Sequence, residues 1–577
     1  MKKPLICALL GLGLATPLLQ AQTAPAPTRE ARNNTAFNAQ LFYQLLLGEL
    51  SASQGDLGSA VSLMADAARR TGDGEIYQRA TELALRARAG ESALQVARSW
   101  RQAQPRSLDA NRYVLQILLA LNRIPETVEP LKSVIDLTPL PEREALLDMV
   151  PALYARTSDK KLATATAEQA LAPMLSDART AAAAWTAVGR LRAASGNAPG
   201  ALDALQRAQA VDASHVPTAL VAVELMDKRH SQAETLVRAY LEKTRPAAPQ
   251  VRLNYARALL ELQRTADSEH QLEILTREHP GVPEGWLLLG SLQQDAQRQA
   301  QAEASLERYL EVAGAQSPRN ERGLAQAYLM LSQLAEKRGD MAAAERWLQR
   351  SDHPDLLVQA QSRRASLLAR RGQMQEAREL LRKLPEREPG DARAKLLAEV
   401  NLLREFKQYG PAHDLLEQAS AQSPQDADLV YEQAMMAEKL ERLDHMEQLL
   451  RRVIALKPDY HAAYNALGYS LADRGVRLQE ARELILKALE FAPDDPFIQD
   501  SLAWVEFRLG NKAEARRVIE AAYKARPDAE IAAHFGEILW SLGEREKAQA
   551  IWREGQALNA DNETLRDTLE RLQGRRP

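Results

Sequence analysis

Residues 464–493 read YNALGYSLADRGVRLQEARELILKALEFAP, and this stretch decides the fold. It contains Gly468 within an otherwise helix-forming run, although a glycine there costs about 1 kcal/mol relative to alanine. A second glycine, Gly475, marks a turn, and the run after it is rich in Ala, Leu and Glu. The stretch ends at Pro493, which has no amide hydrogen to continue a helix. These features predict two helices that are joined by a short turn and closed by proline.

The same order of residues returns along the chain at a nearly constant spacing. Prolines are 34 residues apart in the pairs Pro246 and Pro280, Pro424 and Pro458, and Pro493 and Pro527. About fourteen approximate copies of the pattern cover residues 40–565. A period that persists over such a length is not expected by chance, so the sequence predicts an array of similar helix pairs.

This pattern resembles the tetratricopeptide repeat, a 34-residue helix–turn–helix unit. The resemblance implies an all-α fold, an α-solenoid in which the repeats form a right-handed superhelix with a long concave face. It also implies that small residues at two positions let the helices of one repeat approach closely. Gly290 is therefore expected to face Ala302, and Gly468 to face Ala481.

The expected domain boundaries follow the repeats and the composition of the two ends. Lys2 and Lys3 precede a short apolar run, which is typical of a cleaved secretory signal and predicts export to the periplasm. The single cysteine, Cys7, lies inside that run, so neither lipidation nor a disulfide is expected. The expected segments are a signal peptide at 1–21, a flexible leader at 22–36, N-terminal repeats at 37–139, a degenerate or irregular helical repeat at 140–175, the main repeat array at 176–565 and a C-terminal tail at 566–577.

Charge and motif content argue against two broad classes of function. The 74 basic and 77 acidic side chains are interspersed, so no basic tract supports nucleic-acid binding. No phosphate-binding loop or nucleophile motif occurs, which favours a protein without enzymatic activity, cofactor or small-molecule substrate. No metal site is expected either, because the nine histidines show no paired metal-ligand spacing. They are His215, His230, His270, His279, His353, His413, His445, His461 and His534.

Large aromatic and polar residues recur at positions of the first helix that line the concave face in this kind of repeat. Aromatic side chains on a surface are typical of protein interfaces. Asn465 is expected to hydrogen-bond the backbone of an extended peptide, and the aromatic residues to receive its side chains. The alternative is that Phe507 and Trp540 fill space between repeats and that Tyr469 is incidental. The candidate partner-binding residues are Asn465, Tyr469, Asp473, Asp500, Trp504, Phe507, Glu537 and Trp540.

The first repeat is unusually apolar, although terminal repeats normally present a polar outer face. Its candidate contact residues are Phe37, Leu41, Phe42 and Leu45. A preceding capping helix or a protein partner would cover them, and the capping helix is the simpler explanation.

Residues 41–105 resemble a group of large periplasmic tetratricopeptide-repeat adaptors of carboxy-terminal processing proteases. The resemblance implies that the chain binds such a protease and its substrates, which are cell-wall hydrolases, and promotes their degradation. Association with the outer membrane would then occur only through partners. The alternative function is a structural scaffold of an envelope or exopolysaccharide export assembly.

Overall fold

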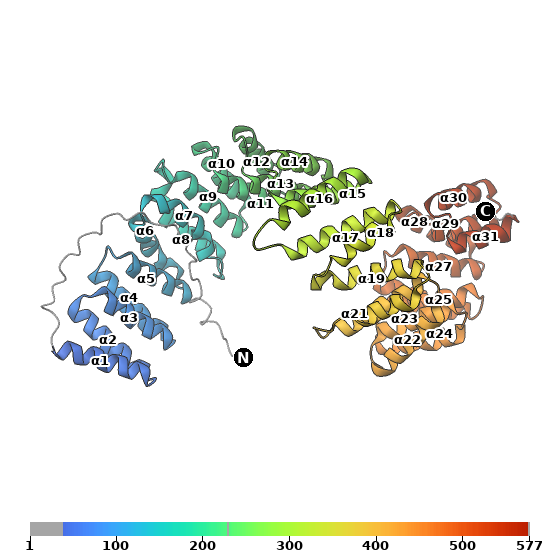
Figure 1. Ribbon diagram of the computed structural model, residues 1–577, viewed down its shortest axis with the longest axis horizontal. Helices are drawn as coiled ribbons and strands as arrows, with labels where there is room; N and C mark the ends of the chain where they lie inside the picture. The colour runs from blue at the N-terminus through green and yellow to red at the C-terminus, as the bar shows by residue number, and fades with distance from the viewer. Residues whose placement is uncertain (1–38, 228–229, 575–577) are drawn as a thin grey trace. The chain divides into compact units, whose positions relative to one another are not determined.

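The structure is a computed structural model that describes residues 39–227 and 230–574. The expected signal peptide, the leader and Phe37 lie outside the described residues. The chain divides into two compact units, one ending at Arg319 and the other beginning at Asn320. This division falls inside the expected main array, and each unit is described here by itself (Figure 1).

Unit 1 is built from helices throughout its described residues. In chain order these are α1 (Ala39–Ser53), α2 (Leu57–Thr71), α3 (Gly74–Arg86), α4 (Gly90–Ala103), α5 (Leu108–Ala120), the 3₁₀ helix η2 (Ile124–Thr127), α6 (Val128–Leu137), α7 (Leu140–Leu153), α8 (Lys160–Leu171), the 3₁₀ helix η3 (Ala172–Ser176), α9 (Ala181–Ala194), α10 (Ala198–Val211), α11 (Val216–Glu224), α12 (Ser231–Lys243), α13 (Pro249–Glu261), α14 (Thr265–Glu278), α15 (Pro283–Asp295) and α16 (Gln299–Gly314).

Unit 2 is likewise helical up to residue 574. Its helices are α17 (Glu321–Lys337), α18 (Met341–Gln349), α19 (Pro354–Arg370), α20 (Met374–Arg382), α21 (Asp391–Glu405), α22 (Tyr409–Gln422), α23 (Ala427–Lys439), α24 (Leu443–Leu456), α25 (His461–Asp473), α26 (Leu478–Phe491), α27 (Pro496–Arg508), α28 (Lys512–Ala525), α29 (Ala529–Ser541), α30 (Arg545–Leu558) and α31 (Glu563–Gln573).

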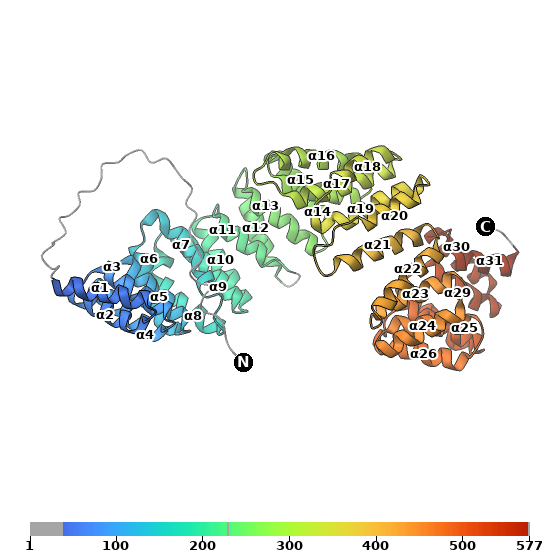
Figure 2. The same ribbon diagram turned by 60° about the horizontal axis from the view of Figure 1, so that its bottom comes forward.

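The packing within each unit is that of an α-solenoid. Successive helices form antiparallel pairs, such as α15 with α16 in unit 1 and α25 with α26 in unit 2. First helices of neighbouring repeats also touch, as α25 touches α27 and α27 touches α29 (Figure 1). Figure 2 shows the pair α25 and α26 from another side. Each repeat therefore buries its apolar faces against its neighbours rather than in one central core. The predicted all-α solenoid is confirmed, with no strand among the residues described.

The glycine inside the first helix is explained by close contact with the second helix. A Cβ atom at Gly468 would lie 2.6 Å from Cγ1 of Ile485 and 2.8 Å from the carbonyl oxygen of Ala481. A Cβ at Gly290 would lie 3.4 Å from the carbonyl oxygen of Ala302. The predicted pairing of small residues is therefore correct, and the close packing of the helices offsets the low helix propensity of glycine.

A repeated hydrogen bond connects the end of one repeat to the first helix of the next. A helix end leaves carbonyl groups without partners inside the helix. In three repeats, a side chain six residues after the proline donates to the proline carbonyl. The donors are Trp286 Nε1 to Pro280 at 3.0 Å, the Tyr464 hydroxyl to Pro458 at 3.1 Å, and Gln499 Nε2 to Pro493 at 3.0 Å. The polar side chain at this position therefore has a structural role in these three repeats.

The segment that we expected to be irregular contains α7, α8 and η3. Helix α7 packs mainly against α9, whereas α8 packs against α6, η2, η3 and α9. The Tyr154 hydroxyl, just after α7, lies 2.7 Å from the hydroxyl of Thr127 in η2, and both residues are buried. This arrangement differs from the regular pairs on either side, where each helix packs against the next one in sequence.

The expected C-terminal tail at 566–577 is wrong for most of its length, because residues 566–573 belong to α31. Leu565 and Leu569 lie four residues apart, share one face of this helix and are buried against α29 and α30. Asn562 caps the helix by accepting a hydrogen bond from the amide of Leu565 at 2.9 Å. Helix α31 therefore covers the apolar end of the array, as a capping helix does in a solenoid.

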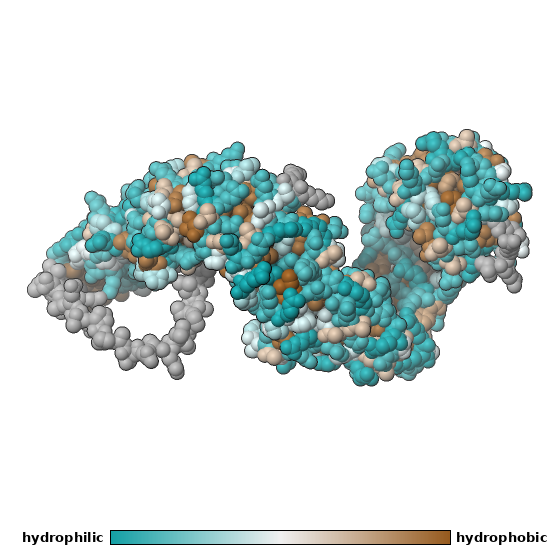
Figure 3. Space-filling view, turned by 90° about the horizontal axis from the view of Figure 1, so that it is seen from above, coloured by the Kyte–Doolittle hydropathy of each residue, from teal (hydrophilic) through white to brown (hydrophobic). Residues whose placement is uncertain are grey.

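The exposed face of the molecule is mainly polar. In Figure 3 hydrophilic side chains cover most of the visible surface, and hydrophobic ones form small separate patches. Among the described helices, none is both long enough and apolar enough to cross a membrane.

Candidate functional site

The candidate partner-binding residues lie on α25, α27 and α29, the first helices of three successive repeats in unit 2. Three of them are buried: Asp500 is 4% exposed, Trp504 5% and Glu537 8%. Asp473 is exposed, and the remaining members are half-buried, namely Asn465, Tyr469, Phe507 and Trp540. The set therefore divides into an interior group and a smaller group that reaches the surface.

The interior group is organised around His534, which the sequence analysis did not select. Its Nδ1 donates to the Asp500 carboxylate, with distances of 3.0 and 2.9 Å to the two oxygens. Its Nε2 lies 3.2 Å from the Tyr469 hydroxyl. The imidazole also stacks on the Trp504 ring, with 4.4 Å between the ring centroids. One buried histidine thus connects side chains from three repeats.

A sequence signal for this contact existed, because Asp500 and His534 are 34 residues apart. Residues one period apart occupy the same position in neighbouring repeats, and first helices of neighbouring repeats touch. The same spacing brings Glu537 to Arg571, with distances of 2.8 and 2.5 Å between the guanidinium and carboxylate groups. A search for opposite charges at intervals of one repeat would have found both pairs.

The surroundings of His534 are strongly acidic. Burial by itself lowers the pKa of His534, but the negative charges of Asp500, Glu530 and Glu537 raise it above its usual value. Burial and nearby carboxylates also raise the pKa of Tyr469, with Asp473 the largest electrostatic contributor. Negative charge is therefore concentrated around the Tyr469 hydroxyl, on a surface formed by α23, α25, α27 and α29. We call this surface the α23–α29 surface.

Two further carboxylates face this region and form no ion pair among the described residues. Burial raises the pKa of Glu530 on α29, and the neighbouring carboxylates of Asp500 and Asp528 raise it further. Burial likewise raises the pKa of Glu438 on α23, with an added contribution from Asp473. The neighbouring carboxylates that help raise these pKa values make this region favourable to positive charge, which suits a basic segment of a partner.

The pH dependence of the Asp500–His534 pair follows from the raised pKa of His534. The pKa of the imidazole in the unfolded chain is about 6.5, so the pair contributes fully to stability below that pH. As the pH rises through the higher pKa of the folded state, this contribution is lost. The test compares the urea midpoint of the wild type with that of the Asp500→Asn, His534→Leu double variant. We expect the wild-type midpoint to fall relative to that of the double variant between about pH 6 and about pH 9. A difference that stays constant over this range would contradict a protonated His534.

Trp504, Phe507 and Trp540 pack between helices rather than presenting free aromatic faces. Phe507 lies 5.4 Å from Trp504 between ring centroids, and Trp540 lies 5.6 Å from the buried Trp552. The expectation that Trp504 faces the groove is wrong, because its ring is covered by His534 and Phe507. For Phe507 and Trp540, the contacts agree with the alternative that they fill space between repeats.

At the other end of the chain, α1 carries the candidate N-terminal contact residues. Leu41 is buried, and Leu45 is half-buried against a cluster that includes Met64 and Ala80. Phe42 is 54% exposed. The described structure thus assigns Leu41 and Leu45 to the packing of the first repeat, while contact of Phe42 with a partner stays a prediction.

Unit 1 contains a pocket of about 410 Å³ beside α7, α8 and α9. Asp148, Tyr154, Lys160 and Arg190 contribute its polar lining. Burial raises the pKa of Asp148, and Glu144 raises it further. The pocket combines one acid and two bases without a nucleophile beside a general base, so it has no recognisable catalytic arrangement.

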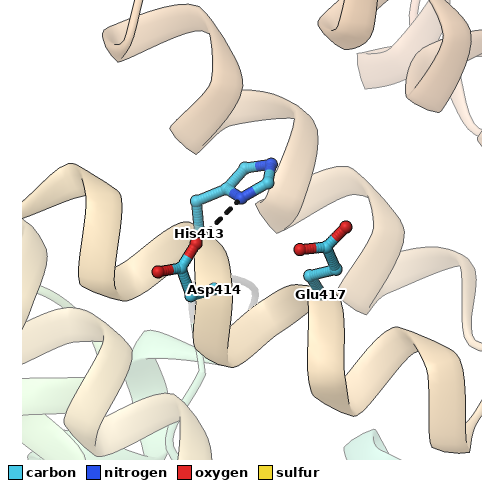
Figure 4. Close-up of side chains that lie close together, drawn as sticks. All are labelled: His413, Asp414 and Glu417. Atoms are coloured by element: carbon cyan, nitrogen blue, oxygen red, sulfur yellow. Dashed lines mark ion pairs between the residues drawn. The ribbon is translucent and has the colours of Figure 1, made fainter.

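One group of side chains on α22 has the composition of a metal site. His413, Asp414 and Glu417 each offer a ligand atom, and these atoms lie within 4.8 Å of one another (Figure 4). Burial lowers the pKa of His413, and the nearby His445 lowers it further. No other group of three or more such side chains meets this criterion among the described residues.

Comparison with known proteins supports the class that the helix pairs and their period define. The family model of the tetratricopeptide repeat matches residues 253–321 and 444–496. The chain therefore contains tetratricopeptide repeats, a kind of repeat that commonly mediates protein–protein binding.

A curated relative is the TPR repeat-containing protein PA4667 of Pseudomonas aeruginosa, which is 38% identical over 249 residues. This match covers 43% of the chain and 42% of that protein, so it spans less than half of the relative's length.

Two solved structures are among those that the chain resembles. A tetratricopeptide repeat protein from Parabacteroides merdae is 17% identical, with a TM-score of 0.33 over 43% of this chain and 97% of that chain. The APC/C hetero-tetramer Cut9–Hcn1 is 13% identical, with a TM-score of 0.31 over 92% of this chain and 96% of that chain.

Proposed function

We propose that the chain is a non-enzymatic periplasmic adaptor that brings a carboxy-terminal processing protease together with its substrates, which are cell-wall hydrolases. The repeat architecture supports the binding of protein partners. The choice of partners rests on the resemblance of residues 41–105 to the periplasmic adaptors, and export rests on the signal-like residues 1–21. Two binding sites on one chain make the second encounter intramolecular, which raises the effective concentration of substrate at the protease.

The proposal of a peptide-binding surface rests on an unpaired side-chain atom of Asn465. It lies on α25 one helical turn before Tyr469, and its Oδ1 has no hydrogen-bond partner among the described residues. An unpaired polar atom at a half-buried position costs about 1–3 kcal/mol. A backbone amide of an extended segment would remove this cost, and the acidic α23–α29 surface beside it would attract basic side chains.

Reconstituted degradation tests the adaptor function. The purified chain is mixed with the carboxy-terminal processing protease and a cell-wall hydrolase of the same organism, and loss of intact hydrolase is followed with time. We expect the chain to accelerate degradation, and Asn465→Ala to weaken hydrolase or protease capture by about 2–10-fold, the value of one hydrogen bond. Gln549→Ala changes an exposed amide on α30 and serves as the matched control.

Two outcomes would count against specific parts of the proposal. If degradation proceeds equally with and without the chain, the adaptor function fails, and copurification with an envelope export assembly would then favour the structural scaffold. If degradation is accelerated but Asn465→Ala and Gln549→Ala behave alike, partners bind elsewhere than at Asn465.

A further inference from the structure

The cluster on α22 is separate from the α23–α29 surface and has a ligand set of its own. His413 and Glu417 are four residues apart, which places them on one face of the helix. Asp414 follows His413 directly, and its Oδ1 lies 3.7 Å from Nδ1 of the imidazole. Figure 4 shows the three side chains projecting from consecutive turns of α22.

The unpaired imidazole nitrogen of His413 is a second, independent observation that favours a bound ion. The residue is only 3% exposed, and its Nδ1 has no hydrogen-bond partner among the residues described. The 3.7 Å separation from Asp414 is too long for a hydrogen bond. Its other nitrogen, Nε2, lies 3.5 Å from Nε2 of Gln433, which fixes the ring from the opposite side. A buried nitrogen without a partner is therefore held beside two carboxylates.

We propose that His413, Asp414 and Glu417 form a binding site for a divalent transition-metal ion such as Zn²⁺. The ligands would be Nδ1 of the imidazole and one oxygen from each carboxylate. This differs from the expectation of no metal site, because a single histidine with two acids gives no paired-histidine spacing in the sequence.

The ligand atoms that these three side chains offer favour some metal ions over others. One nitrogen and two carboxylate oxygens suit Zn²⁺ and its neighbours, whereas Ca²⁺ and Mg²⁺ prefer oxygen donors alone. Around tetrahedral Zn²⁺ the ligand atoms lie about 3.3 Å apart, as bonds of about 2.0–2.2 Å require. The present spacing of up to 4.8 Å closes by rotation of two exposed side chains, since Asp414 and Glu417 both reach solvent. His445 on α24 lies beside the site, with 5.3 Å between its ring centroid and that of His413.

Charge at the site also favours a dication. The carboxylates of Asp414 and Glu417 both act on His413, and His445 and Arg442 act on it with the opposite sign. The two carboxylates attract a divalent ion.

Zinc titration of the full chain, prepared without an affinity tag and stripped with a chelator, tests the proposal. Binding is measured by competition with a chromophoric chelator, with Co²⁺ absorption as a second readout of coordination geometry. We expect one saturable site that depends on these side chains. Because changes beyond the direct ligands already cost about 10–100-fold in metal affinity, Glu417→Gln and Asp414→Asn should each weaken binding by at least about tenfold.

Matched variants distinguish a built site from general binding to surface acids. Glu520→Gln removes an exposed carboxylate from α28 and should leave zinc affinity unchanged. His413→Ala should abolish binding, and circular dichroism checks that the helices are retained. The proposal is overturned if the wild type shows no saturable site, or if Glu417→Gln and Glu520→Gln bind zinc with equal affinity.

Discussion

Replacing His534 with leucine is expected to lower the free energy of unfolding of the C-terminal repeats by about 3–5 kcal/mol at pH 7. The Asp500 carboxylate is 4% exposed, and its hydrogen bonds among the described residues all come from His534. Without the imidazole this carboxylate stays buried without a partner, which is far more costly than losing the pair as a whole. Hydrogen exchange of the amides in α27–α31, together with urea unfolding, measures the effect.

The double variant Asp500→Asn, His534→Leu is the control for this prediction. It removes the buried negative charge together with its partner, so we expect it to recover a large part of the lost stability. Equal destabilisation in the single and double variants would mean that His534 acts through packing on Trp504 instead of through the charge of Asp500.

Replacing Trp552 with alanine is expected to destabilise the same region by about 3–5 kcal/mol. Trp552 is 1% exposed and belongs to the cluster formed by α27–α31. Its Nε1 also donates a hydrogen bond to the carbonyl oxygen of Ala533 at 3.2 Å. The substitution leaves a large cavity between α29 and α30, and a lowered urea midpoint with faster exchange in these helices is the expected result.

Gly536 provides an internal test of this packing. A Cβ atom there would lie 2.1 Å from Nε1 of Trp552, so Gly536→Ala should cost about 1–3 kcal/mol through overpacking. In a Trp552→Leu background the same glycine substitution should cost clearly less, because the indole is gone. Identical costs in both backgrounds would show that the glycine is not required by Trp552.

Much of the fold was predictable from local sequence. The period, the helix pairs and the close contact of Gly468 with Ala481 all follow from residues within a single repeat. The start of α27 also depends on nearby residues, since Asp495 accepts hydrogen bonds from the amides of Phe497 and Ile498. The leucines of α31 carried a helical spacing that the sequence analysis did not use, so the terminal helix was predictable as well.

The candidate site was only partly predictable. Repeat positions correctly placed Asp500 and Trp504 on the first helix of their repeat, but they did not show that both are buried. Burial there depends on His534, which belongs to the next repeat, and on Tyr469, which belongs to the preceding one. A pattern within a single repeat does not reveal the histidine that connects three of them.

The sequence by itself determined that this protein is a linear array of helix pairs with a tetratricopeptide period. It can do so because each helix and each intra-repeat contact depends on residues close together in the chain. Only the tertiary structure shows which polar groups meet and which lose contact with water, as at His534 and at His413. These contacts require side chains from several repeats to meet at one point, and a local pattern does not specify how deeply each of them is buried.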